Sequence, residues 1–240
     1  MATMLPPSGE VPAGAGCDTK DLVFVHDAFR RLYQVMPAGV RGTPASDPKR
    51  VRAVARNVLL VGEALHHHHH FEDDSFWDAM TARKPACAIH VDLMRQHHRE
   101  VAVLIDATPA LIDAWCADPG PATSEPLAVQ LEQTGAVLRN HLENEERLAM
   151  PVMQEVFTQE EWDALGAQAQ KTYDRSQIFL FFGLIQDSLT PEVAADLMKE
   201  IPAVIRTLYK FYGRRQYERS LALLSAGTAV PGYRPSEGAA

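Results

Sequence analysis

The sequence predicts an all-α protein, an up-down four-helix bundle with additional C-terminal helices packed on it. Apolar residues recur at helical spacing over most of the chain, and no segment shows the alternation of a strand. Glycine and proline fall mostly between these periodic segments. The chain has 240 residues, 46% of them hydrophobic and 22% charged, which is enough to bury a sizeable core.

Four long helices make up the predicted bundle, which covers residues 19–157. Asp47 and Pro48 supply the N-cap and the first-turn proline of the second helix. Bends are expected at Pro109 and Pro151. The helices are expected over 18–36, 48–81, 86–117 and 124–156, separated by the proline- or glycine-containing segments 37–42, 84–85 and 118–121.

Further helices are predicted over residues 158–225. Thr158 and Glu161 form a capping box that opens the first of them. Thr190-Pro191 opens another, and Pro202 starts or bends the last.

The apolar segment 178–185 predicts a helix that is buried on more than one side. We expect it to pack on the bundle; a lid or a homodimer surface is the alternative. The residues outside the helices, 1–18 and 226–240, are rich in small residues and proline and are expected to be disordered.

Charge and composition exclude several classes of partner. The net charge is −8, which disfavours nucleic acid and anionic membranes, and the basic, aromatic segment 210–219 is too short to change that. No apolar run approaches the ~18 residues of a membrane span, and the N-terminus lacks a signal-peptide pattern. A cytoplasmic location fits the three cysteines, Cys17, Cys87 and Cys116.

Histidine is the unusual residue of this sequence. There are ten, and five are consecutive at residues 66–70, which resembles a purification tag. The run lies inside the second predicted helix and continues its periodicity, so we interpret it as native sequence.

Each long helix has one seam of positions spaced alternately three and four apart. Every seam is mainly apolar, yet each carries a histidine, and two carry a glutamate four residues later. Residues i and i+4 share a helix face, so each His-x-x-x-Glu aims an imidazole and a carboxylate at one point. The seams hold no lysine or arginine, so buried carboxylates there need a metal. The candidate metal ligands are His26, His68, Glu72, His98, His141 and Glu145.

Helical rise tests whether the four histidines share one level. His68 and His98 lie ~21 Å and ~17 Å from the turn between their helices, and His98 and His141 lie ~27 Å and ~25 Å from theirs. His26 fits less well. It lies ~15 Å from its helix end while His68 lies ~30 Å along the next helix, so the linker must make up the difference.

The other histidines fit the seams less well. His90 is too near the start of the third helix, and His97 is turned about 100° from the seam. In the run of five, only His68 is in register, and His69 is nearest to it. Tyr33 shares the His26 seam and is a further ligand only if the backbone shifts. Residues expected around the ligands are Tyr33, His69, Met94 and His97.

Six ligands of this kind suit two metal ions better than one tetrahedral zinc. Mixed nitrogen and oxygen donors favour iron or manganese over calcium. The ferritin type of bundle uses Glu-x-x-His, with glutamate first, so the His-x-x-x-Glu order disfavours it. The structural alternative is that these histidines are hydrogen-bonded core residues.

The order His, His-x-x-x-Glu, His, His-x-x-x-Glu resembles the hemerythrin-like proteins, the HHE cation-binding domain family. The resemblance rests on VFVHDAFRRL, HHHFEDDSFW, LMRQHHREV and HLENEERLAMPVM, and covers roughly residues 19–157. It implies a left-handed four-helix bundle with two non-heme iron ions, oxo- or hydroxo-bridged, with manganese as the second choice. In such a centre His26 and His68 hold one iron, His98 and His141 hold the other, and Glu72 and Glu145 bridge.

Two departures from the oxygen-carrying hemerythrins bear on function. Met94 stands where they have a fifth histidine, and the last motif is His-x-x-x-Glu rather than His-x-x-x-x-Asp. Fewer histidines leave more open coordination, which suits reaction with dioxygen, peroxide or nitric oxide over reversible oxygen carriage. We expect a role in oxidative or nitrosative stress, with turnover left open. The alternatives are an iron or oxygen sensor, and a helical scaffold with vestigial ligands.

Overall fold

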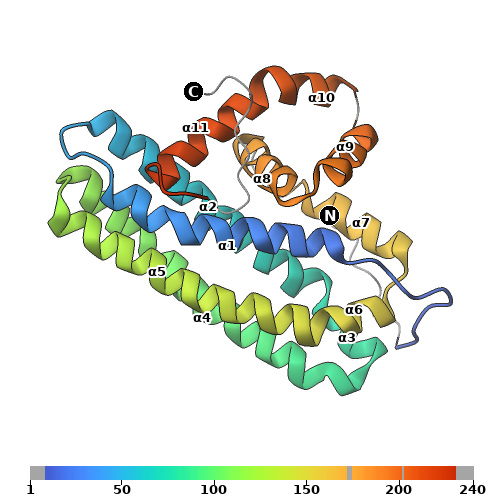
Figure 1. Ribbon diagram of the computed structural model, residues 1–240. Helices are drawn as coiled ribbons and strands as arrows, with labels where there is room; N and C mark the ends of the chain where they lie inside the picture. The colour runs from blue at the N-terminus through green and yellow to red at the C-terminus, as the bar shows by residue number, and fades with distance from the viewer. Residues whose placement is uncertain (1–8, 172–174, 202, 231–240) are drawn as a thin grey trace.

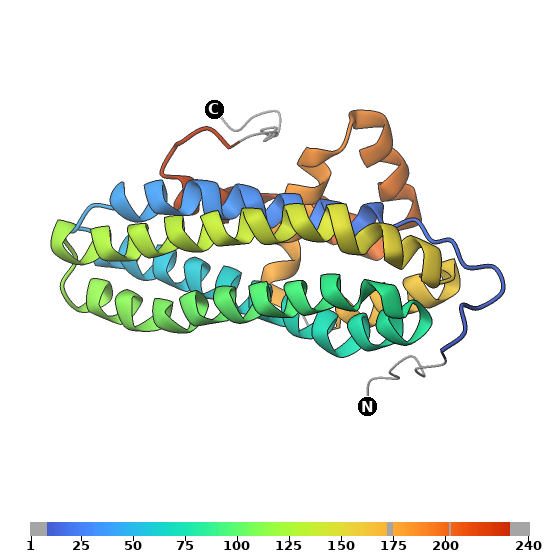
Figure 2. The same ribbon diagram turned by 90° about the horizontal axis from the view of Figure 1, so that it is seen from below.

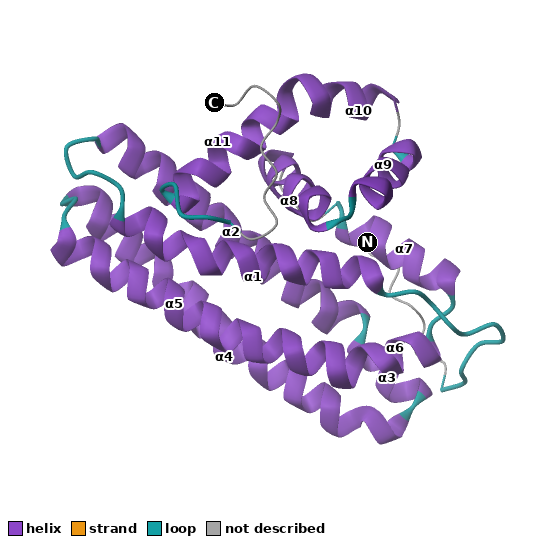
Figure 3. Cartoon of the chain, viewed as in Figure 1, coloured by secondary structure: helices purple, strands orange, loops and turns teal. Residues whose placement is uncertain are grey.

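The computed structural model describes residues 9–171, 175–201 and 203–230, and every regular element in these ranges is helical (Figure 3). The all-α prediction is therefore confirmed. Four long helices run side by side as a bundle (Figure 2). Helix α1 packs against α2 and α5, and α4 packs against the same two neighbours. The bundle helices are α1 (Lys20–Arg41), α2 (Pro48–Ser75), α4 (Ala88–Ala117) and α5 (Pro121–Asn144).

Short helical segments connect and extend the bundle. Helix α3 (Trp77–Arg83) and a 3-10 turn (Pro85–Cys87) lead from α2 into α4. A π-helical segment (Glu145–Ala149) lies between α5 and α6 (Met150–Val156). None of the helices in the described part of the chain has the length and apolar character that crossing a membrane requires.

Helix α1 is longer than predicted. It passes through Pro37 and ends only at Gly42, whose N–H donates to the carbonyl of Ala38. Val40, beyond the proline, is fully buried, so tertiary packing outweighs the hydrogen bond that proline removes. The five extra residues add about 8 Å of helix beyond His26, which removes about half of the height mismatch in the sequence prediction.

One other boundary was also predicted wrongly. The second helix ends at Ser75 rather than at residue 81, because Phe76 interrupts it and its ring stacks on Trp162 at 5.4 Å. Pro109 lies within the uninterrupted helix α4. Pro151 occupies the first turn of α6, where a missing N–H is tolerated.

The C-terminal helices follow the predicted caps. Thr158 and Glu161 form the capping box of α7, and Thr190 caps α9 by accepting from the backbone N–H of Val193. Pro202 lies outside the described residues. The elements are α7 (Gln159–Ala169), α8 (Arg175–Ser188), α9 (Pro191–Glu200), α10 (Ala203–Leu208), a π-helical segment (Tyr209–Gly213) and α11 (Arg214–Ser225).

Helices α8 and α11 pack on the bundle over α1 and α2 (Figure 1). The ring of Phe181 on α8 contacts Phe29 on α1, with centroids 5.0 Å apart. Tyr217 on α11 is fully buried and donates to the buried carboxylate of Asp187 on α8. Packing on the bundle, the favoured interpretation of segment 178–185, is therefore what the structure shows. A homodimer through these helices stays a prediction.

The segments flanking the helices differ in part from the expected disordered arms. Cys17 is buried against the bundle, and its thiol donates to the carbonyl of Met153. Val230 packs partly against the main core. Residues 1–8 and 231–240 lie outside the described residues.

The apolar core is divided into two clusters. The larger one contains buried residues of α1 from Ala28 to Val40, with residues of the other bundle helices and of α8 and α11. The smaller one contains Leu22, Phe76, Met94 and residues of the α6–α7 region. Between them, each long helix contributes its candidate metal ligands, so a polar layer crosses an otherwise apolar bundle.

A close contact of helix α11 with the bundle gives a stability prediction. A Cβ added at Gly39 on α1 would collide with the backbone carbonyl oxygen of Leu224 on α11. Because backbone cannot rotate away, we expect Gly39→Ala to lower the free energy of unfolding by about 1–3 kcal/mol.

Thermal and denaturant unfolding of the full chain measures this effect. Gly62→Ala on α2 is the matched control, since its Cβ meets nothing closer than Ile105 at 3.7 Å. The control should be neutral or slightly stabilising. Equal effects of the two variants would contradict the close packing of α11 on α1.

Candidate metal centre

The six candidate ligands meet in one buried layer of the bundle. His26 comes from α1, His98 from α4 and His141 from α5, while α2 supplies its histidine and glutamate one turn apart. The buried glutamate of the α5 motif lies at the start of the π-helical segment. Every member is at least nine-tenths buried: His26, His68, Glu72, His98, His141 and Glu145.

The histidines of the layer form two pairs. The rings of His26 and His68 have centroids 5.3 Å apart, and those of His98 and His141 are 4.6 Å apart. Helical spacing alone suggested convergence, and the structure brings each pair together from two different helices.

Each glutamate reaches one histidine of both pairs. The two oxygens of Glu72 lie 3.2 Å from His68 Nε2 and 3.4 Å from His98 Nε2. Glu145 Oε2 lies 3.6 Å from His26 Nε2 and 3.5 Å from His141 Nε2. A carboxylate between two imidazole pairs is placed as a bridge between two ions would be.

The inward-facing atoms of this layer have no hydrogen-bond partner among the residues that the structure describes. They are buried, and the acceptor oxygens of both glutamates are among them, which is costly for groups removed from water. A metal ion is the partner that imidazole nitrogens and carboxylate oxygens share, so the donor set fits a metal centre. The atoms are Nε2 of His26, His68, His98 and His141, and both carboxylate oxygens of Glu72 and Glu145.

The electrostatics of the layer also call for a cation. Burial, and then the nearby Glu72 carboxylate, raise the pKa of Glu145 well above its ordinary value. Burial lowers the pKa of His68 to about 4, and burial with repulsion from His98 lowers the pKa of His141 well below its ordinary value. Without a bound cation, Glu145, His68 and His141 therefore favour their neutral forms.

Each glutamate is directly followed by an acidic residue, and the two side chains contact the same histidine ring on another helix. With its proton on Nδ1, His98 donates to Asp73 at 2.9 Å, and His26 donates likewise to Glu146 at 2.9 Å. Burial alone would lower the pKa of His98, but Asp73 and Glu72 raise it to about 8. A carboxylate on Nδ1 fixes the tautomer and turns Nε2 toward the metal position.

Sequence reasoning left these outer carboxylates unassigned. The available signal was the acid that directly follows the glutamate in both His-x-x-x-Glu motifs. The partners of the acids were not visible in sequence. Asp73 also accepts from the Trp77 indole N–H at 2.8 Å, and Glu146 pairs with Arg30 at 2.8 Å.

The π-helical segment begins at Glu145 and widens the helix at that point. Both Glu145 and Glu146 reach the His26 ring, one at each nitrogen. Helix α2 is regular through Glu72 and Asp73, which contact the two nitrogens of His98 in the same way. The two halves of the layer thus repeat one arrangement.

His69 lies closer to the layer than sequence reasoning suggested. Its ring stacks on His98 at 4.3 Å and lies 4.9 Å from His141. Nitrogens of the three rings lie within 4.8 Å of one another, and His69 Nε2 is buried without a partner. His69 is therefore a further candidate ligand.

The other residues expected around the ligands have different surroundings. The His97 ring lies 5.8 Å from His141 and is buried. Met94 is fully buried in the smaller apolar cluster, and Tyr33 is buried in the larger one, beside Gly135. No contact of Tyr33 with the layer is seen among the described residues.

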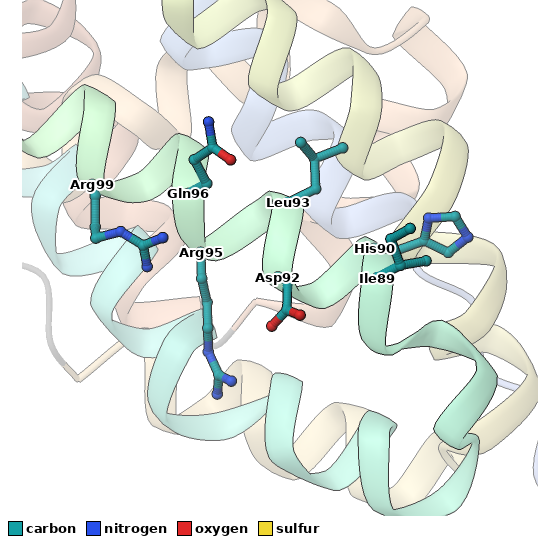
Figure 4. Close-up of a pocket in the computed structure, with 7 residues that line it drawn as sticks. All are labelled: Ile89, His90, Asp92, Leu93, Arg95, Gln96 and Arg99. Atoms are coloured by element: carbon teal, nitrogen blue, oxygen red, sulfur yellow. The ribbon is translucent and has the colours of Figure 1, made fainter.

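His90 lies away from this layer. It lines a hollow of about 630 Å³ on the outer side of α4 (Figure 4). None of the six candidate ligands lines the hollow, whose lining residues all belong to that one helix: Ile89, His90, Asp92, Leu93, Arg95, Gln96 and Arg99. We therefore assign it no part in metal binding.

Comparison with known proteins gives one match. The family model described as hemerythrin HHE cation binding domain matches residues 17–153, which is more than half of the chain. The match includes all four bundle helices and the six candidate ligands. No curated protein and no solved structure matches the chain.

The outer carboxylates give a prediction for metal affinity. Asp73→Asn keeps the size of the side chain but removes the charge that orients His98. We expect metal affinity to fall roughly 10–100-fold, as for other groups that orient a ligating histidine. Competition with a chelator measures this affinity.

Asp106→Asn is the matched control, because Asp106 is an exposed acid on α4 about two turns beyond His98. It should leave affinity unchanged. If both variants bind metal as the unmodified chain does, Asp73 has no orienting role.

Proposed function

The chain belongs to the hemerythrin HHE cation-binding domain family, and from this premise we propose that it is a non-heme di-iron protein. In this proposal it binds or reacts with dioxygen, peroxide or nitric oxide in the response to oxidative or nitrosative stress. The cytoplasmic location expected from the cysteine content is part of the same proposal.

One observation carries the proposal: the layer holds two histidine pairs, and each of its two glutamates contacts one histidine of the first pair and one of the second. In our assignment His26 and His68 hold one ion, and His98 and His141 hold the other. Glu72 and Glu145 each contact one histidine of both pairs, which supports a bridging role.

Iron is the metal we propose, with manganese second. Imidazole and carboxylate donors suit both, and the six side chains leave positions open on two ions. When bound, iron supplies the redox and ligand-binding chemistry that dioxygen, peroxide and nitric oxide require.

The chain's own contribution is orientation and exclusion of water. Asp73 and Glu146 hold the imidazoles of His98 and His26 with Nε2 turned inward. Phe29 packs on the His68 ring at 5.4 Å, and Trp77 on His98 at 6.0 Å, so aromatic rings flank the layer. An apolar surround of this kind limits solvent access to a metal site.

Metal analysis of the full chain, expressed with iron, tests the proposal. We expect about two irons per chain, as in carboxylate-bridged helical bundles. His68→Ala and Glu145→Ala should lose most of this iron, because each removes an inward-facing donor. Absorption spectra should change when peroxide or nitric oxide is added.

His67→Ala is the matched control, since His67 is an exposed histidine of the same run. It should keep the full iron content. An iron-free wild-type chain, or full iron content in both ligand variants, would contradict the di-iron proposal.

The same iron analysis, applied to a His69 variant, tests whether His69 is also a ligand. We propose that its buried nitrogen joins His98 and His141 on one ion. His69→Gln should then lower iron content toward one per chain. Unchanged content and spectra would assign His69 a packing role only.

A sensor function is a second candidate, favoured by a contact chain from the C-terminal helices to the layer. Phe181 on α8 packs on Phe29, and Phe29 packs on His68. Through these rings, a change in the layer has a direct route to α8.

Limited proteolysis of the metal-free and iron-loaded chain tests the sensor candidate. We expect iron to slow cleavage within residues 178–225, and Phe181→Leu to weaken this protection. Identical cleavage patterns with and without iron would exclude metal-dependent ordering of these helices, while leaving the di-iron proposal standing.

A further inference from the structure

The five consecutive histidines do more than supply ligands to the buried layer. At about 100° per residue they cover every side of α2. His68 and His69 are buried and face the layer, whereas His70 is exposed and His66 is partly exposed. The proposed di-iron centre uses neither His66 nor His70.

His66 and His70 form a pair on the surface of α2. They are four residues apart, and their ring centroids lie 4.6 Å apart at an interplanar angle of 72°. This separation equals that of His98 and His141 within the buried layer. Neither imidazole has a hydrogen bond or ion pair with another described residue, so their nitrogens are available to a ligand.

Carboxylates flank this pair on the same side of the helix. Glu63 lies three residues before His66, and Asp74 lies four residues after His70, which places all four within one stripe about 80° wide. Both acids are exposed. The stripe therefore combines two imidazoles with a negative potential and has water access for the remaining coordination positions.

We propose that His66 and His70 form a second metal site, which binds one divalent transition-metal ion such as Zn²⁺ at the surface of α2. Two histidines at i and i+4 on one helix face are a recurring zinc-binding arrangement, and imidazole suits zinc, copper and nickel. Glu63 and Asp74 raise the local concentration of cations.

This site is separate from the buried layer. The direction of the His66–His70 pair is roughly 130° around α2 from that of His68 and His69. One helix thus presents a surface pair of imidazoles beside two buried ones. The surface site captures a metal ion without the bundle having to open.

Zinc binding to the iron-supplemented full chain, measured by calorimetry and equilibrium dialysis, tests the proposal. The double variant His66→Gln/His70→Gln should take up about one equivalent of Zn²⁺ less than the unmodified chain. His67→Gln is the matched control, because it removes an exposed histidine of the same run that points about 80° away from the pair.

The result that overturns the proposal is equal Zn²⁺ uptake by the double variant and the unmodified chain, or an equal loss in His67→Gln. The single variant His70→Gln alters one exposed side chain and should also lose the equivalent, which covers the case of a poorly folded double variant. The comparison does not depend on the di-iron proposal, because His66 and His70 lie outside the layer and iron content is measured separately in each variant.

Discussion

The burial of two carboxylates among imidazoles is the constraint on which the rest of the structure depends. Glu72 and Glu145 lie in a layer that divides the apolar core into two clusters, and within the described part of the chain their oxygens have no hydrogen-bond partner. Such an arrangement is costly unless a cation occupies the layer. The family match, the four converging helices and the unpartnered nitrogens all agree with a metal in this place.

The surrounding structure orients this layer. Asp73 and Glu146 each directly follow one of the two glutamates and accept a hydrogen bond from Nδ1 of His98 and His26, respectively. The same local arrangement therefore occurs twice in a bundle that has no evident sequence repeat. A π-helical segment at Glu145 accompanies the second copy. Helices α8 and α11 enlarge the core on one side, and Phe181 connects them to the layer through a single aromatic neighbour.

The sequence predicted the fold class and the meeting of six side chains, because both follow from helical periodicity. It misplaced the end of α1, since local rules stop a helix at Pro37 whereas packing carries it on to Arg41. It placed His69 around the ligands, because periodicity does not show that its ring stacks on His98 of α4 and lies beside His141 of α5. Helical periodicity also could not predict the partners of Asp73 and Glu146, because those histidines lie on other helices, α4 and α1.

Anomalous X-ray diffraction from crystals of the iron-loaded chain, recorded at the iron absorption edge, tests the central claim most directly. The account predicts two anomalous peaks within the layer, about 3.5–4 Å apart as in other two-metal sites, with Glu72 and Glu145 between them. One peak belongs beside His26 and His68, and the other beside His98 and His141. The absence of any peak in the layer, or one peak that leaves a glutamate uncoordinated, would contradict it.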